Sequence, residues 1–149
     1  MSRCSKFRYF SSVALACLVL MVSGCGDGRP SRVKVSGTVK LDGENVTEGS
    51  VAFKPIGGGR MGIGAIGPDG NFTVSMYVEG DGLPPGEYAV SINSSKNIND
   101  TTLRWFAPKK YADVKTSGLT AEIKQDTDSM NFELTWEGSN HKKPWNQRQ

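Results

Sequence analysis

VKVSGTVKLDGENVTEGSVAFKP, residues Val33–Pro55, has the clearest structural period in the chain. Apolar and polar residues alternate from Val33 to Leu41 and again from Val51 to Pro55. This alternation predicts two strands, each with one buried face. The dipeptide Asp42-Gly43 separates these strands and is typical of a two-residue hairpin turn. The segment therefore predicts antiparallel β-structure.

The same two-residue period recurs along the rest of the chain, and no segment after the first thirty residues shows a helical stripe of apolar residues. Pro68-Asp69-Gly70 and Leu83-Pro84-Pro85-Gly86 supply turns between the alternating segments. A weaker strand with glycines at alternate positions is expected over 61–66. The further alternating segments are 72–76, 88–92, 119–123 and 130–134.

These segments predict an all-β fold, an antiparallel Greek-key β-sandwich of about seven strands, within residues 32–136. Each sheet would cover the apolar face of the other, and an open barrel is the structural alternative. Phe53, Phe72, Tyr88 and Phe132 fall on the inward face of their strands, so they are expected to share one interior.

The first 25 residues have the order of zones found in a secretory signal peptide. Three basic residues precede the apolar run 10–22, which is shorter than the roughly 20 residues of a membrane span. The step Val22-Ser23-Gly24-Cys25 resembles the bacterial lipobox. The resemblance implies cleavage of a lipoprotein signal peptide, residues 1–24, and a lipid thioether on Cys25. An ordinary secretory peptide or a short uncleaved anchor is the alternative.

Cleavage would change the charge and the cysteine content of the chain. Residues 1–24 carry three basic and no acidic side chains, so their loss lowers the net charge from +3 to zero. The mature protein then lacks the basic surface of a nucleic-acid binder, and nucleic acid is not expected as a partner. Cys25 would be the one cysteine left. We expect residues 25–31 to form a lipidated flexible linker and residues 137–149 a polar tail.

Several quoted motifs carry a family resemblance over Val33–Thr135. VKVSGTVKLDGENVTEGSVAFKP, GPDGNFTV and LPPGEYAVSI resemble carboxypeptidase regulatory-like and transthyretin-like domains. PKKYADVKTSGLTAEI, followed by a strand near Phe132, resembles small lipoproteins of planctomycete bacteria. The resemblance implies a transthyretin (prealbumin)-like sandwich. One departure is Ile66-Gly67-Pro68-Asp69-Gly70, which stands where the family often has a Thr-Asp-x-Asp-Gly turn.

The sequence offers no recognisable catalytic site. Hydroxyisourate hydrolases are enzymes with a transthyretin-like fold. Their active site is built from histidines, an arginine and a C-terminal Tyr-Arg-Gly-Ser. This chain has one histidine, His141, and ends Trp-Asn-Gln-Arg-Gln. It also lacks a Cys–His pair, a histidine cluster for zinc, a Gly-x-Ser-x-Gly motif and calcium-loop spacing. We expect neither enzymatic activity nor a metal or cofactor.

The long connection Ser94–Ala112 combines aromatic and basic residues. Its candidate partner-binding residues are Trp105, Lys109, Lys110 and Tyr111, because aromatic side chains beside cations are common in recognition surfaces. In the alternative interpretation, Trp105 and Tyr111 fold back and cap the open end of the sandwich.

These observations predict a non-enzymatic, lipid-anchored protein of the bacterial cell envelope, facing the periplasm or the exterior. It would act as a structural or protein-interaction module. Its expected partners are the membrane, through the lipid on Cys25, and an envelope protein or a glycan. The rival hypothesis is a carbohydrate- or solute-binding lipoprotein that uses the aromatic and basic loop 94–112.

Overall fold

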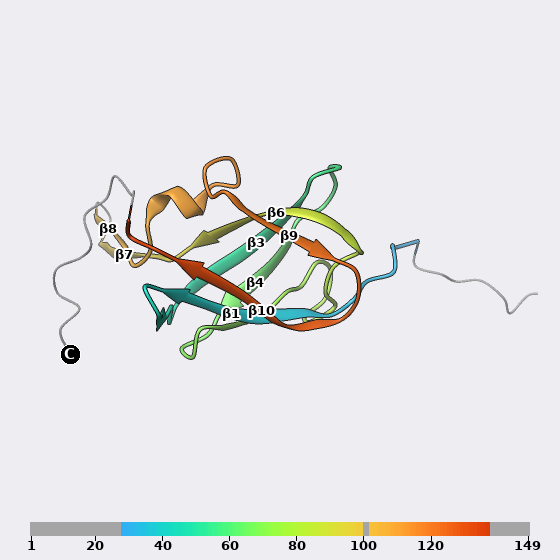
Figure 1. The fold of residues 1–149 in the computed structure, drawn as a ribbon, viewed down its shortest axis with the longest axis horizontal. Coiled ribbons are helices and arrows are strands. Elements are labelled where there is room, and N and C mark those ends of the chain that lie inside the picture. The colour runs from blue at the N-terminus through green and yellow to red at the C-terminus, as the bar shows by residue number, and fades with distance from the viewer. Residues whose placement is uncertain (1–27, 100–101, 138–149) are drawn as a thin grey trace, which may run out of the picture. The chain divides into compact units, whose positions relative to one another are not determined.

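The computed structural model describes residues 28–99 and 102–137. The chain divides into two units, Met1–Pro30 and Ser31–Gln149, and the strands belong to the second (Figure 1). The predicted signal peptide 1–24 and Cys25 lie outside the described residues, as does the polar tail beyond residue 137.

Strands dominate the described ranges, which contain no α-helix. No helix in these ranges is long and apolar enough to cross a bilayer. The all-β prediction is therefore confirmed. The elements are β1 (Val35–Leu41), β2 (Glu44–Asn45), β3 (Gly49–Pro55), β4 (Gly62–Ile66), β5 (Asn71–Thr73), β6 (Gly86–Asn93), β7 (Ser95–Asn99), β8 (Thr102–Trp105), the 3-10 helix η2 (Lys109–Ala112), β9 (Leu119–Ile123) and β10 (Thr127–Leu134).

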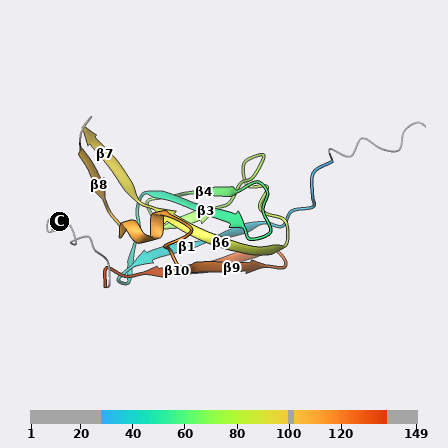
Figure 2. The same cartoon turned by 90° about the horizontal axis from the view of Figure 1, so that it is seen from above.

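The main sheet is one continuous hydrogen-bonded surface that curls over on itself. Its strand order is β10-β1-β5-β4-β3-β6-β9, with β2 paired to β1. Figure 2 shows β3 and β4 on one side and β9 and β10 on the other, with β1 and β6 between them in this view. The two facing layers are sandwich-like, as predicted, but the path β1-β5-β4 and the β6–β9 pairing join them into one sheet. Greek-key connectivity stays a prediction.

An aromatic cluster fills the space between the facing layers. Phe53 on β3 lies 6.1 Å from Phe132 on β10, measured between ring centroids, although three strands separate β3 from β10 in the sheet. Phe72 is 6.1 Å from Phe53, and Tyr88 is 6.2 Å from it. All four rings are at most 7% exposed. The prediction of one shared interior for these residues is confirmed, because alternation placed each of them on the inward face.

Asp42-Gly43 forms a tight hairpin turn, but this turn joins β1 to the short β2 and not to β3. Asp42 and Gly43 both have positive φ, 51° and 88°, as in a type I′ turn. The turn returns the chain into the short β2, which pairs with the end of β1. Strand β3 lies elsewhere, between β4 and β6. Alternation identifies a strand but carries no information about its neighbour.

The sheet is antiparallel throughout its main path except where β1 meets β10. These two strands run parallel, with Val39 opposite Phe132. The backbone of β10 passes so close to Gly37 that a Cβ there would overlap the Met130 carbonyl oxygen. The glycine therefore permits the close approach of the two strands. The sequence predicted antiparallel strands throughout. It did not reveal this parallel pair, because parallel and antiparallel strands share the same two-residue period.

Candidate functional site

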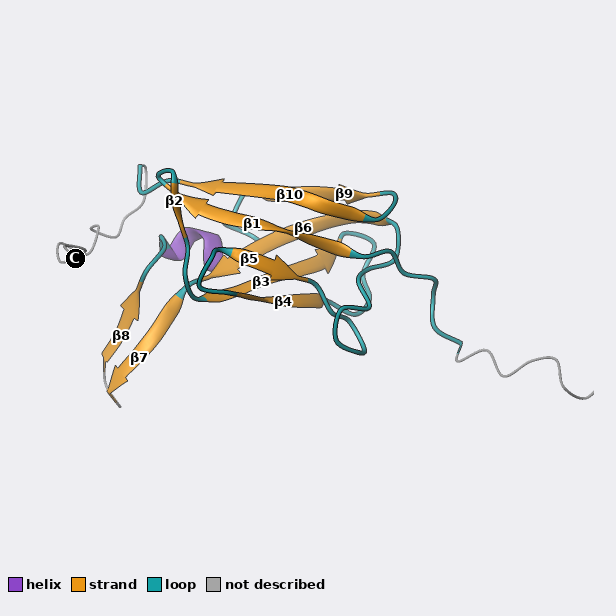
Figure 3. Cartoon of the chain, turned by 90° about the horizontal axis from the view of Figure 1, so that it is seen from below, coloured by secondary structure: helices purple, strands orange, loops and turns teal. Residues whose placement is uncertain are grey.

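The segment that the sequence presented as a long loop forms a β-hairpin followed by a 3-10 helix. Strands β7 and β8 pair with each other as a separate two-stranded sheet, in register Ser95 opposite Trp105 and Lys96 opposite Arg104. The hairpin projects from one end of the curled sheet (Figure 3). The sequence presented 94–112 as a long connection and did not predict these two strands and the 3-10 helix within it.

The base of the hairpin is clamped to the sheet by Ser94, which is buried. Its hydroxyl donates to the Glu48 carbonyl at 2.7 Å, and its own carbonyl accepts from the backbone N–H of Phe106 at 2.8 Å. Both strands of the hairpin are thus held where they leave the sheet. Beyond that point the described side chains of β7 and β8 are largely exposed.

The two faces of the hairpin differ in chemistry. Lys96 and Arg104 are cross-strand partners and share one face, and the Lys96 ammonium lies 3.5 Å from the Glu48 carboxylate. Leu103 and Trp105 share the other face because side chains two apart on a strand point the same way. One face therefore carries the two cations, and the other carries Leu103 and Trp105 opposite the polar Asn97 and Ser95.

Of the two residues that the alternative interpretation placed in a cap, Tyr111 is buried there with Lys110 beside it, whereas Trp105 is only half-buried. Tyr111 of η2 is 7% exposed, and its hydroxyl oxygen accepts from the backbone N–H of Thr135 at 3.3 Å. The Lys110 ammonium lies 4.7 Å from the Tyr111 ring centroid and donates to the Glu137 carbonyl at 3.3 Å. Figure 3 places η2 between the two layers, where it closes the end of the interior.

The surroundings of Tyr111 also affect its ionisation. Burial by itself would raise the pKa of the phenol. The hydrogen bond from Thr135 and the nearby Lys110 ammonium act in the opposite direction and together hold the pKa below 10.0.

The other two predicted residues form a second pair at the root of the hairpin. Trp105 is half-buried and Lys109 is exposed, and the Lys109 ammonium lies 5.9 Å from the Trp105 ring centroid. The structure therefore separates the predicted set into a structural pair, Lys110 and Tyr111, and a more accessible pair, Trp105 and Lys109.

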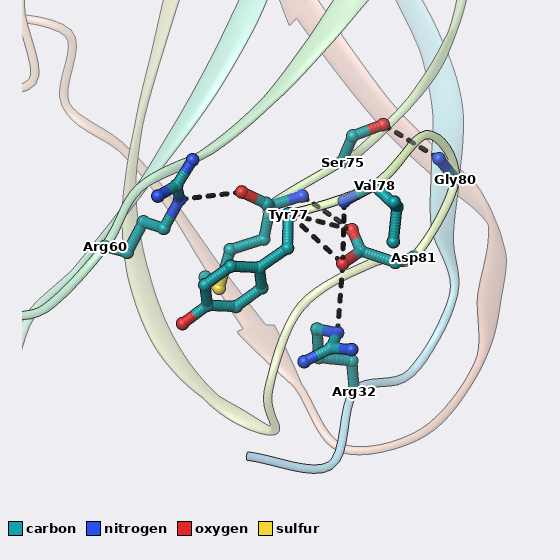
Figure 4. A network of polar contacts seen from close by, with 8 residues as sticks. Arg32, Arg60, Ser75, Tyr77, Val78, Gly80 and Asp81 are labelled. Atoms are coloured by element: carbon teal, nitrogen blue, oxygen red, sulfur yellow. Dashed lines mark hydrogen bonds and ion pairs between the residues drawn. The ribbon is translucent and has the colours of Figure 1, made fainter. Parts of the chain in front are cut away.

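A polar cluster that the sequence did not suggest lies in the loop between β5 and β6 (Figure 4). The Asp81 carboxylate is 3.1 Å from the Arg32 Nε. It also accepts from the backbone N–H groups of three successive residues, Met76 at 2.7 Å, Tyr77 at 3.1 Å and Val78 at 3.2 Å. This one side chain thus bonds three successive backbone N–H groups of the loop.

Arg60 joins the same cluster from the loop between β3 and β4. Its Nε donates to the Met76 carbonyl at 2.7 Å. The guanidinium carbons of Arg60 and Arg32 lie 4.9 Å and 5.1 Å from the Tyr77 ring centroid. Two cations thus stack against one aromatic ring at the surface.

The Asp81 environment favours the carboxylate. Partial burial acts to raise the pKa, but the three backbone N–H groups and the Arg32 guanidinium outweigh it and hold the pKa below 3.8. The available sequence signal was Gly80-Asp81-Gly82, since aspartate between glycines is typical of a turn that its own side chain stabilises. Its bond to Arg32, which is remote in sequence, had no such signal.

No protein-family model, curated protein or solved structure matches the chain. The resemblances noted in the sequence therefore stay expectations, and the site is interpreted from its geometry.

Two further features bear on ligand binding. A hollow of about 600 Å³ lies over the outer face of β4 and β5, lined mainly by apolar and small residues that include Ile63, Ala65 and Thr73. Among residues 28–99 and 102–137, no group of three or more His, Cys, Asp or Glu side chains is placed to hold a metal ion. The residues that line the hollow lie between Ile63 and Gly80, before the hairpin in the sequence. They include none of the four predicted contact residues.

Proposed function

We propose that this protein is a non-enzymatic, lipid-anchored module of the bacterial envelope that presents the β7–β8 hairpin to a partner protein. The observation that carries the proposal is the position of the hairpin. It projects from the end of the sheet opposite the end where β1 begins and where the β5–β6 loop lies (Figure 2). A lipid on Cys25 would tether the chain where it enters β1, and the hairpin lies at the other end of the sheet.

The chemistry of the hairpin suits a protein partner. In the described part of the chain, β7 and β8 pair only with each other, so each offers an outer backbone edge for strand addition. Ile98 and Leu103 are 49% and 47% exposed, which provides apolar contacts beside those edges. A partner strand would gain main-chain hydrogen bonds and side-chain contacts together.

The same geometry offers less to a glycan. Sugar binding by stacking needs accessible aromatic faces, and Tyr111 is buried in the cap with Lys110 bonded beside it. Trp105 with Lys109 is the remaining platform, and the hollow over β4 and β5 lies apart from it. We therefore favour protein recognition over the rival hypothesis.

Site-specific crosslinking in native membranes tests the proposal. A photoreactive amino acid at Leu103 is expected to give one discrete protein adduct. The same amino acid at Thr73, which is also exposed but lies on β5, is the matched control and is expected to give none. Absence of a discrete adduct at Leu103 contradicts the proposal. Retention on purified envelope polysaccharide that is lost in Trp105→Ala would favour the glycan-binding hypothesis instead.

A further inference from the structure

Exposed apolar side chains gather on two loops at the β1 end of the sheet. Ile56 and Met61, in the β3–β4 loop, are 61% and 42% exposed. Tyr77 and Val78, in the β5–β6 loop, are 36% and 59% exposed. We call these four residues, together with Arg60, the proximal surface.

Hydrogen bonds tie both loops to the place where the domain begins. Val33 forms an isolated antiparallel bridge with Leu83, and Arg32 pairs with Asp81 of the same β5–β6 loop. Arg60 then links the β3–β4 loop to it through the Met76 carbonyl. The two loops that carry the apolar side chains are therefore bonded to each other and to the first residues of the domain (Figure 4).

We propose that the proximal surface rests on the phospholipid surface to which the protein is anchored. The inference rests on the proposed lipid at Cys25. Six residues separate Cys25 from Arg32, and a fully extended chain of that length reaches about 25 Å at most. The first residue of the domain, and the loops bonded to it, are thus confined to the neighbourhood of the bilayer.

The side chains match the chemistry of a membrane interface. Isoleucine, methionine and valine can insert among acyl chains, and tyrosine favours the headgroup level, where its ring and hydroxyl meet different environments. Arg60 uses its Nε for the Met76 carbonyl, and its terminal N–H₂ groups are suited to a lipid phosphate.

Charge alone would not produce this contact. Asp81 is paired with Arg32, and Glu79 is an exposed acid on the same loop. The proposal therefore relies on apolar insertion and on phosphate contacts from Arg60, and it predicts binding to both zwitterionic and anionic bilayers.

Fluorescence quenching in vesicles tests this arrangement. The full chain, extracted from membranes, is reconstituted into vesicles of phosphatidylcholine and phosphatidylglycerol that contain doxyl-labelled lipid. A genetically encoded fluorescent amino acid is placed at Ile56, or at Leu103 on the hairpin as the matched exposed control. We expect strong quenching at Ile56 and none at Leu103. Val78→Asp should remove most of the quenching at Ile56, whereas Ile98→Asp on the hairpin should leave it unchanged.

The outcomes separate this inference from the anchor on which it rests. An intact mass that shows acylated Cys25, with no quenching at Ile56, overturns the docking proposal and leaves the anchor standing. A probe at Ile56 that is shielded from water without quenching indicates a second copy of the chain on this surface and also overturns it. An unmodified Cys25 overturns the anchor and the docking proposal together.

Discussion

Asp81 shows how one side chain can organise a loop that has no secondary structure. Its two carboxylate oxygens accept hydrogen bonds from three backbone N–H groups of the loop. They also form an ion pair with the Arg32 guanidinium. Because the side chain is 9% exposed, these donors would lack an equivalent partner if the carboxylate were removed. We expect the loop to depend on this single residue.

The first prediction is that Asp81→Asn destabilises the domain. Asparagine keeps the shape but loses the charge and one acceptor oxygen, and hydrogen bonds to charged groups contribute about 1.5–3 kcal/mol each. We expect the free energy of unfolding to fall by about that amount in urea denaturation. Asp128→Asn, an exposed position on β10, is the control and should change it by less than about 0.5 kcal/mol. Equal stability of the two variants would contradict this account of the loop.

The second prediction concerns pH. The pKa of Asp81 lies below 3.8 in the folded state, so the unfolded state binds the proton more readily. Its contribution to stability is therefore present above about pH 4 and is lost as the pH falls through the folded pKa. Asp81→Asn should show a shallower loss of stability below pH 4 than the parent chain. Parallel acid-unfolding curves would be the contrary result.

At the scale of single elements, the sequence predicted those strands that bury one face. The interior positions of β1 and β3 alternate as predicted, because burial selects apolar residues at every second position. Strands β7 and β8 are exposed on nearly every described side chain, so no such selection marks them. Their hairpin is stabilised by pairing and by the Ser94 clamp, and the alternation rule could not reveal it.

The candidate site was predictable to a similar degree. Aromatic and basic residues in 94–112 were visible in the sequence, but their separation into a cap and a hairpin root depends on η2 and on the Thr135 bond to Tyr111. The cluster around Asp81 joins loops that are distant in sequence, and sequence spacing alone does not predict such a contact.

The third prediction uses this separation. Tyr111→Ala should cost about 3–5 kcal/mol, since it empties a buried aromatic position. Trp105→Ala should cost less than about 1.5 kcal/mol, because the ring is half-buried, and should reduce crosslinking at Leu103. Thermal unfolding and adduct yield, measured on both variants, check the prediction. A Trp105→Ala variant that lost stability while keeping full crosslinking would assign Trp105 to the scaffold.

At the scale of the whole domain, the curled sheet depends on aromatic contacts between strands that are not neighbours. Phe132 lies 6.0 Å from Phe72 and 6.1 Å from Phe53, so it joins β10 to both β5 and β3. The layers face each other across these rings, and the parallel β1–β10 pair holds β10 in register.

The fourth prediction is that Phe132→Ala costs about 3–5 kcal/mol, a large part of the roughly 5–15 kcal/mol typical of a domain. Thr73→Ala, on an exposed outer position of β5, is expected to have little effect. Differential scanning calorimetry of both variants provides the measurement. A Phe132→Ala variant that melts with the parent chain would contradict the packing between the layers.

The last prediction tests the anchor, on which the outward-facing hairpin and the proximal surface both depend. It is measured as the intact mass of the protein extracted from native membranes. We predict the mass of residues 25–149 plus acyl groups on Cys25, and an unprocessed or misrouted chain for Cys25→Ala. A chain that retains residues 1–24, or an unmodified Cys25, would contradict the lipid-anchored function proposed for this protein.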